Sequence, residues 1–291
     1  MLTCPKRTKQ LRTLSSYRVL AAIALVLSLS SLVSAQTSSG QPPGATESGD
    51  ADLAKKLSNP ISDLVSVPIQ FNWEQNVGPD EQTRFILNVQ PVMPFALTPK
   101  LNLVARVIVP LVSQPTLFEG GSAASGVSDI LTSFFFVPNT GSSFTWGIGP
   151  VMSLPSTTEP TLGTEKWSAG PTVVALKQAG PWTVGGLWNQ VWSFSGNARR
   201  EDVNQMFVQP FLAYTTAKAL TITLQSESVG NFNADADQWT VPINLLFSKV
   251  ATFGTFPASY QVGFGGYAVR PPTGPSWKIR GAIVLLLPRR R

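Results

Sequence analysis

The sequence predicts an all-β protein, a transmembrane antiparallel up-and-down β-barrel of about twelve strands with a cleaved N-terminal signal peptide. Three observations predict this fold. Apolar and polar residues alternate from residue 64 onward, the links between the alternating segments are long and short by turns, and tryptophans lie near segment ends. The 24 prolines and 23 glycines among 291 residues also argue against a helical protein.

Residues 1–35 are predicted to be a secretory signal peptide. A basic segment precedes the apolar run VLAAIALVLSLSSLV, and Val33, Ser34 and Ala35 form an A-x-A-like cleavage site. Cleavage there would make Gln36 the first residue of the mature chain. An uncleaved anchor helix is the alternative, but the run falls short of the roughly 20 residues that a spanning helix needs.

Residues 36–63 are predicted to be a linker followed by a short helix. The stretch QTSSGQPPGATESG has the Ser, Gly and Pro content of a disordered linker. Asp50 or Asp52 could cap a helix that must end near Pro60. We interpret this helix as a plain periplasmic segment, with a small plug of the barrel mouth as the alternative. The barrel itself is expected over residues 64–291.

Alternation with a period of two identifies the strands. In VSVPIQFNWE, residues 65–74, large apolar side chains fall on one face, and the other face carries mostly polar side chains. Successive side chains of a strand point to opposite faces, so this pattern indicates a strand with one apolar face. About twelve such segments approach the roughly 9–11 residues of a transmembrane strand. They span residues 64–74, 83–93, 101–111, 127–137, 144–154, 166–177, 182–193, 203–214, 220–228, 238–248, 260–269 and 276–287.

The links between the segments alternate in length. Odd-numbered links such as VSQPTLFEGGSAASG and PSTTEPTLGTE are long and polar, whereas even-numbered links such as QAGP and TTAKA are short. Residues 249–259, KVATFGTFPAS, are the one long even-numbered link. Outer-membrane barrels have short periplasmic turns and longer external loops. The pattern therefore predicts a bacterial outer-membrane barrel with both termini in the periplasm.

Tryptophans near the segment ends are predicted to form two aromatic girdles at the levels of the lipid headgroups. The alternative is that they are core anchors. The loop assignment places Trp146 and Trp182 toward the periplasmic rim and the others toward the outer rim. The predicted girdle comprises Trp73, Trp146, Trp167, Trp182, Trp192, Trp239 and Trp277.

Arg106 indicates which face of the strands lines the lumen. It lies opposite the apolar stripe of LNLVARVIVPL, and on the lipid face its charge would cost roughly 2–4 kcal/mol at the bilayer midplane. The interior is either a conduit for a polar or amphipathic solute or a bonded network that stabilises the wall. The candidate lumen-lining residues are Gln70, Asn72, Arg84, Asn88, Gln90, Asn102, Arg106, Asp129, Gln225, Glu227, Asn244 and Arg280, with Glu74 and Lys278 on the same face.

The composition argues against several functional classes. No residue is histidine, which removes Ser-His-Asp catalysis, histidine-ligated zinc and histidine acid–base chemistry. We expect no enzyme activity, no catalytic residue, no metal and no cofactor. The net charge of +6 is carried largely by the two ends of the chain, so no basic face for nucleic acid is expected. Expected partners are outer-membrane lipid, lipopolysaccharide and a small-molecule solute.

Six strings together resemble a known family: NVQPVMPF, GVSDI, WGIGPV, LGTEKWSAGPTVVAL, GGLWNQVWSFSG and VNQMFVQPFLAY. The sequence is similar to an outer-membrane transporter family linked by name to the meta-pathway of phenol degradation, often mislabelled neuromedin U. The resemblance extends from about Asp52 to Pro288 and implies an outer-membrane barrel that admits aromatic compounds. The chain departs from such barrels in ending IVLLLPRRR, without the usual final aromatic residue.

The predicted function is a porin-like outer-membrane channel for passive uptake of small amphipathic or aromatic molecules. The mixed lumen favours this solute class, because Ile86, Val104, Ile108 and Leu131 share the inward face with the polar residues. The alternative is a closed structural or adhesive barrel whose outer loops bind partners.

Overall fold

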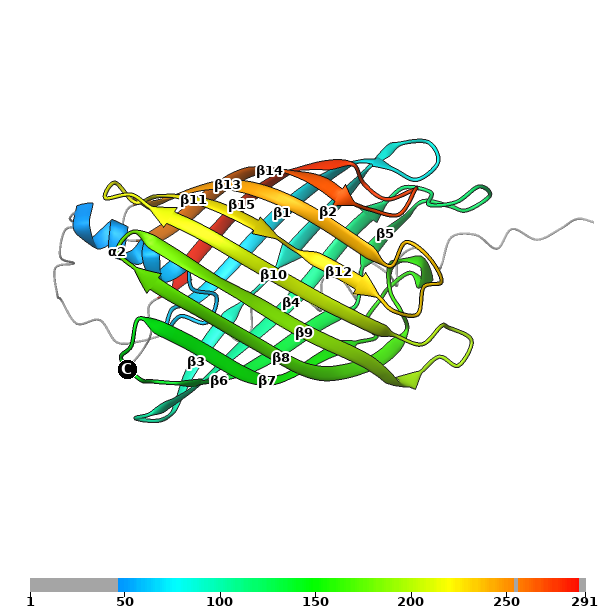
Figure 1. The fold of residues 1–291 in the computed structure, drawn as a ribbon. Coiled ribbons are helices and arrows are strands. Elements are labelled where there is room, and N and C mark those ends of the chain that lie inside the picture. The colour runs from blue at the N-terminus through cyan, green and yellow to red at the C-terminus, as the bar shows by residue number, and fades with distance from the viewer. Residues whose placement is uncertain (1–46, 254–255, 288–291) are drawn as a thin grey trace, which may run out of the picture. The chain divides into compact units, whose positions relative to one another are not determined.

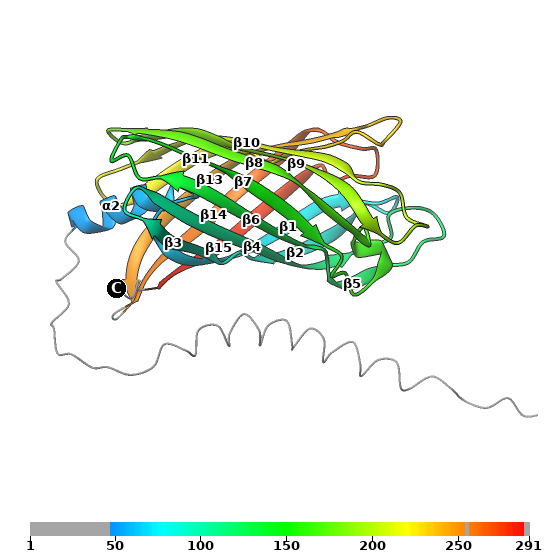
Figure 2. The ribbon, with the colours of Figure 1, turned by 90° about the horizontal axis from the view of Figure 1, so that it is seen from below.

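The computed structural model describes residues 47–253 and 256–287 (Figures 1 and 2). They comprise the helix α2 (Glu47–Leu57), the 3-10 turn η1 (Pro160–Leu162) and fifteen strands. The expected signal peptide, the first part of the expected linker and the basic C-terminal residues 288–291 lie outside the described residues. The strands are β1 (Val65–Val77), β2 (Gln82–Val89), β3 (Val92–Thr98), β4 (Leu101–Gln114), β5 (Ala124–Val127), β6 (Ile130–Pro138), β7 (Phe144–Leu154), β8 (Lys166–Ala179), β9 (Trp182–Gly196), β10 (Asn204–Thr215), β11 (Leu220–Ser226), β12 (Ser228–Asn231), β13 (Trp239–Phe253), β14 (Phe256–Val269) and β15 (Trp277–Leu287).

All the strands belong to one antiparallel sheet that closes on itself, which confirms the predicted fold class. β1 pairs with β15 at the seam, from Val65 opposite Leu287 to Gln75 opposite Trp277. Three strands are interrupted, as β2/β3, β5/β6 and β11/β12, so the wall has twelve barrel strands. Closure matters because it leaves no unpaired strand edge, the condition for crossing a bilayer with strands.

The interruption between β2 and β3 has a local cause in the sequence. Pro91 has no N–H to donate to a neighbouring strand, so the ladder cannot continue through it. The wall is repaired around this point, because Gln90 N donates to Pro68 O at 2.8 Å and Val107 N donates to Pro91 O at 3.1 Å. β2 and β3 therefore act as one barrel strand between β1 and β4.

The prediction of a long link over residues 249–259 is wrong. β13 runs to Phe253 and β14 begins at Phe256, and Ala251 pairs with Ala258 in between. Small and polar residues in this stretch hide its strand character, because they lack the apolar alternation that marks the other strands. The remaining links follow the expected pattern except 78–81, which is shorter than the short-turn link 139–143 although it lies at the same end of the barrel as the long links. We call the two ends of the barrel the short-turn rim (links 99–100, 139–143, 180–181 and 216–219) and the long-loop rim (links 78–81, 115–123, 155–165, 197–203, 232–238 and 270–276).

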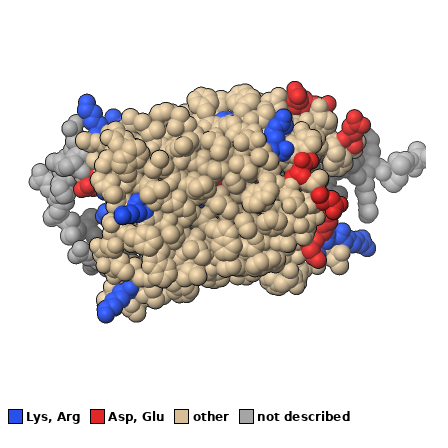
Figure 3. All heavy atoms as spheres, viewed as in Figure 1, with Lys and Arg blue, Asp and Glu red and all other residues tan. Residues whose placement is uncertain are grey.

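The outer face of the barrel is a broad apolar surface. Val184, Leu224 and Phe264 are 52, 50 and 60% exposed, values that would be unusual for large apolar side chains of a water-soluble wall. In Figure 3 the charged side chains gather toward the two ends, with most of the acidic ones at the long-loop rim, and most of the middle of this face carries no charge. Separately, none of the described helices is long and apolar enough to span a membrane.

The predicted girdle tryptophans lie toward the two rims on the outside of the wall. Six of them are between 39 and 49% exposed, and Trp182 at the short-turn rim packs edge-on against Tyr214, with ring centroids 4.8 Å apart. Trp239 differs, because it is half-buried against Phe232 and lies over Gly230. A ring of amphipathic aromatic side chains at each rim is the arrangement that lipid headgroups favour.

The segment before β1 lies at the short-turn rim and enters the barrel. Leu53, Ala54 and Leu57 of α2 pack against Ala219 and Val250 of the wall. Beyond the helix, the side chain of Ile61 is only 3% exposed. It lies in an apolar cluster inside the barrel whose other members are Val92, Val104, Phe135, Val137, Val174, Leu176, Leu187 and Phe211.

Neither of the two residues predicted to cap this helix lies at its N-terminus. α2 already runs from Glu47, so Asp50 and Asp52 lie within it and neither is its N-cap. The helix is tied to the wall by Gln178, whose Nε2 donates to Lys55 O at 2.9 Å. A segment fixed at both α2 and Ile61 occupies part of the short-turn mouth.

Candidate functional site

The barrel interior holds a cavity of about 520 Å³ that is bordered by polar side chains from β1, β2, β4, β10, β11, β13, β14 and β15. Strand alternation is what places them there, since the residues between them face outward. At its short-turn end the cavity is bordered by residues of α2 and the segment after it, including Ala54, Pro60 and Ser62. About eight strands leave a barrel interior that side chains just fill, so a twelve-stranded wall has room to spare.

Most of the predicted lumen residues border this cavity. The inward positions of β1 and β2 contribute through the same alternation that the sequence displays, and Glu74 and Lys278 border it as well. The predicted residues that border it are Gln70, Asn72, Arg84, Asn88, Gln90, Arg106, Gln225, Glu227 and Arg280.

Three predicted residues do not border the cavity. Asn102 is half-buried near the short-turn end of β4. Asp129 lies in the break between β5 and β6 toward the long-loop rim, where its Oδ2 accepts hydrogen bonds from Thr164 N at 2.6 Å and Thr164 Oγ1 at 2.7 Å. Asn244 is 1% exposed, and neither amide atom has a hydrogen-bond partner among the described residues.

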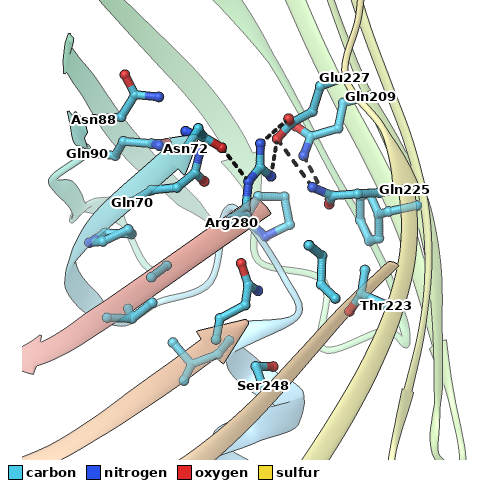
Figure 4. Close-up of a pocket in the computed structure, with 18 of the residues that line it drawn as sticks. Gln70, Asn72, Asn88, Gln90, Gln209, Thr223, Gln225, Glu227, Ser248 and Arg280 are labelled. Carbon is cyan, nitrogen blue, oxygen red and sulfur yellow. Dashed lines mark hydrogen bonds and ion pairs between the residues drawn. The ribbon is translucent and has the colours of Figure 1, made fainter. Parts of the chain in front are cut away.

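The most connected group in the interior centres on Glu227, which lies in the break between β11 and β12 (Figure 4). Arg280 of β15 holds its carboxylate with two parallel bonds, Nη2 to Oε2 at 2.5 Å and Nη1 to Oε1 at 2.9 Å. Lys278 Nζ lies 3.4 Å from Oε2, and Gln225 Nε2 donates to Oε1 at 3.2 Å. Arg280 Nε donates to Asn72 Oδ1 at 2.8 Å, which links the group to β1.

Gly265 of β14 leaves space for Lys278 of this group. β13 and β14 separate β15 from β11 and β12 in the wall, so the side chains of Lys278 and Arg280 and the side chain of Glu227 meet across these two strands. A Cβ on Gly265 would lie 3.1 Å from Lys278 Cε and 2.2 Å from Asn244 Oδ1. Gly265 of the run GFGGYA therefore provides space for the buried side chains of Lys278 and Asn244, a role that only the folded structure reveals.

A second ion pair lies closer to the long-loop rim. Arg84 Nη2 of β2 lies 2.6 Å from Glu74 Oε2 of β1, and Tyr267 of β14 donates its hydroxyl hydrogen bond to the other oxygen of Glu74. The Lys278 ammonium lies 5.4 Å from the centre of the Tyr267 ring, which connects this pair to the Glu227 group. Both carboxylates of the cavity wall are thus paired with cations.

Arg106 differs from these cations. Its Nη2 donates to Gln90 Oε1 at 2.7 Å, and no carboxylate of the described residues lies within salt-bridge distance of it. It borders both the main cavity and a second one of about 210 Å³, which lies against strands β6 to β10. The two cavities also share Ile108, Phe207 and Val229, so they meet at this point.

The interior combines hydrogen-bonding groups, two neutralised carboxylates, one unpaired guanidinium and apolar patches. Such a surface can hydrogen-bond a polar group of a solute while an apolar part of the solute contacts Ile86, Ile108 or Phe207. The sequence alone did not identify Phe207 and Tyr267 as residues of the cavity wall, or Ile61 as a residue that lies inside the barrel. Their positions follow from contacts between distant strands, although Phe207 and Tyr267 do occupy inward positions in the alternation.

Solved outer-membrane proteins share this fold. An outer membrane channel from Pseudomonas putida F1 superimposes with a TM-score of 0.56 at 14% identity, covering 77% of this chain and 96% of that one. The NanC porin superimposes with a TM-score of 0.51 at 8% identity, covering 77% of this chain and 100% of that one. At such identities the likeness establishes an outer-membrane barrel fold and leaves the solute open. No protein-family model and no curated protein matches the sequence.

The prediction that the chain is not an enzyme is wrong as an inference from the sequence. Outer membrane phospholipase A from Escherichia coli, an enzyme by name, is among the matching solved structures, with a TM-score of 0.44 and 12% identity over 83% of this chain and 98% of that one. A chain without histidine loses some catalytic mechanisms only, and other catalytic groups remain available to a barrel.

Proposed function

We propose that the chain is an outer-membrane channel through which small amphipathic molecules, aromatic ones included, diffuse. The observation that carries the proposal is the cavity of about 520 Å³ inside a closed wall with an apolar outer face. An apolar exterior with aromatic rims suits lipid, and a polar interior with free volume suits a dissolved molecule. The folds shared with a channel and a porin agree with this function.

The finer parts of the proposal rest on the sequence and on general rules. The short-turn rim faces the periplasm and the long-loop rim faces outward with lipopolysaccharide around it, because outer-membrane barrels keep their long loops outside. The solute class follows from the shared inward positions of Gln70, Asn88, Ile86 and Ile108. The resemblance to the family linked to phenol degradation agrees with an aromatic solute.

A closed structural or adhesive barrel is the second candidate. It is favoured by one observation, the packing of Ile61 inside the barrel with Val104 and Phe135, which fills part of the interior at the short-turn end. In that case the outer loops would bind partners and the interior would only support the wall.

Conductance in planar lipid bilayers separates the two candidates. The full chain is purified from the membrane fraction and added to a bilayer in potassium chloride. The channel predicts discrete steps of ion current and flux of small amphipathic solutes into liposomes. A folded barrel that gives neither current nor flux would contradict the channel and favour the closed barrel.

A further inference from the structure

The junction between the two interior cavities carries an unpaired positive charge. Arg84 is paired with Glu74, and both Lys278 and Arg280 are paired with Glu227, at distances between 2.5 and 3.4 Å. Arg106 has a neutral partner, the amide oxygen of Gln90. Of the described cations that border the main cavity, Arg106 therefore stands apart in lacking a carboxylate partner.

The guanidinium also keeps most of its hydrogen-bonding capacity. An arginine carries five N–H donors in a planar fork that matches the two oxygens of a carboxylate. Gln90 Oε1 accepts from Nη2, and no other acceptor of the described residues bonds the group. A half-buried cation with free donors is stabilised by an anion that can reach it.

The cavity beyond Arg106 has a different chemistry. Its wall includes Leu187 and Val191, which are 4% and 6% exposed, and Phe207 stands at the junction. Ser168 also borders it, at 1% exposed, and its Oγ has no hydrogen-bond partner among the described residues. A buried hydroxyl without a partner is costly, so a polar group of an occupant would stabilise it.

We propose that this junction binds small amphipathic monocarboxylates, with Arg106 holding the carboxylate and the second cavity holding the apolar body. The proposal rests on the proposed function, because it names the solute class of the same conduit. Arg106 borders both cavities, and its planar fork of free donors matches the two oxygens of one carboxylate. Apolar walls beside Arg106 favour a carboxylate with a hydrocarbon body over a bare ion.

Three probes of similar size and different charge test the binding site: benzoate, neutral benzyl alcohol and cationic benzylammonium. Their binding to the full chain folded in detergent is measured by titration calorimetry. Arg106→Gln removes the unpaired charge, whereas the matched control Arg199→Gln removes the same charge from an exposed position in the link 197–203, away from both cavities. Arg106→Lys keeps the charge and removes the fork. Heat-modifiable migration on a gel verifies that each variant is folded.

The wild type should bind benzoate more tightly than the other two probes. Arg106→Gln should weaken benzoate binding about tenfold or more, Arg106→Lys should weaken it less, and Arg199→Gln should change it by less than about twofold. The proposal is overturned if the wild type does not prefer benzoate, if Arg106→Gln binds it unchanged, or if Arg199→Gln weakens it equally.

Uptake of the same probes into liposomes separates this proposal from the proposed function. If benzoate binding depends on Arg106 but none of the probes crosses the liposome membrane, the channel is contradicted and the binding site stands. If the probes cross and binding is indifferent to Arg106, the channel stands and the binding site is contradicted.

Discussion

Arg280 holds Glu227 from across two intervening strands, with the guanidinium and carboxylate joined by two parallel bonds of 2.5 and 2.9 Å. Glu227 also forms a salt bridge with Lys278, so one carboxylate contacts two cations, Lys278 and Arg280, which are 4% and 3% exposed. The pairing ties β15, the last strand of the chain, to the β11/β12 strand through the barrel interior. It adds a link to the wall beyond the backbone ladder.

Replacing Glu227 with glutamine should destabilise the folded barrel. The substitution leaves Arg280 and Lys278 buried without a carboxylate, a change that costs about 3–5 kcal/mol when one partner of a buried ion pair is removed. Denaturant unfolding in detergent, followed by heat-modifiable migration, measures the loss. Glu119→Gln is the control, because Glu119 is exposed in a long loop. Equal stability of the two variants would show that the Glu227 pairing is not stabilising.

Gly265 and Gly266 are neighbours with opposite expected tolerance of a methyl group. Gly265→Ala places a Cβ 2.2 Å from Asn244 Oδ1 and close to Lys278, so we expect a loss of about 1–3 kcal/mol. At Gly266 nothing lies within 4 Å of the added Cβ, so Gly266→Ala should be close to neutral. Denaturant midpoints of the two variants check this difference, and the reverse order would contradict the role given to Gly265.

Ile61 is expected to hold the segment after α2 inside the barrel mouth. Ile61→Ala removes buried side-chain volume worth about 2–5 kcal/mol. The loss should loosen the segment, so that trypsin cleaves the chain after Lys55 and Lys56 more rapidly. Single-channel conductance should rise, because this segment borders the cavity at the short-turn end. Lys56→Ala, at an exposed position of α2, controls for the conductance effect. Unchanged conductance in Ile61→Ala would mean that the segment does not narrow the mouth.

Trp182 should stabilise the barrel at the short-turn rim. Its ring packs edge-on against Tyr214, so Trp182→Ala should lower the stability in lipid vesicles by about 1–2 kcal/mol, and Trp182→Phe should recover part of the loss. Phe118→Ala is the control, because Phe118 is a 63% exposed ring in a long loop. The stability of each variant is measured as the temperature at which its migration on a gel changes from that of the folded to that of the unfolded chain. If Trp182→Ala is as stable as the wild type, Trp182 does not stabilise the barrel at the short-turn rim.

Much of the fold follows from the sequence because alternation is a local property. The inward position of Arg106 and the outward position of Leu103 can be read from one short stretch of sequence, and the same holds for Gln70 and Phe71. Residues 249–259 are predicted to form a link because small and polar side chains replace the apolar stripe there, although their backbone pairs as in any strand. Whether a stretch without alternation forms a strand depends on its pairing with neighbouring strands, which the sequence does not display.

Contacts inside the lumen could not be predicted in this way. Glu227 meets Arg280 because three strand pairings set the register between them, and a shift of one pairing would separate the two groups. Asn244 is predicted to line the lumen, but it is buried beside Gly265 of β14 and does not border the cavity. Arg84 and Arg106 look alike in the sequence, and only the structure shows that the first is paired and the second is not.

The central claim is that adjacent side chains face lipid and water in turn around a closed wall. Leu224, 50% exposed on the outer face, and Gln225, which borders the cavity, test it directly. Cys4 is the one cysteine of the sequence, so Leu224→Cys and Gln225→Cys are each made in a Cys4→Ser chain and exposed in liposomes to a membrane-impermeant maleimide. The account predicts labelling of the Gln225→Cys chain and protection of the Leu224→Cys chain. Labelling of the Leu224→Cys chain at an equal or greater rate would contradict it.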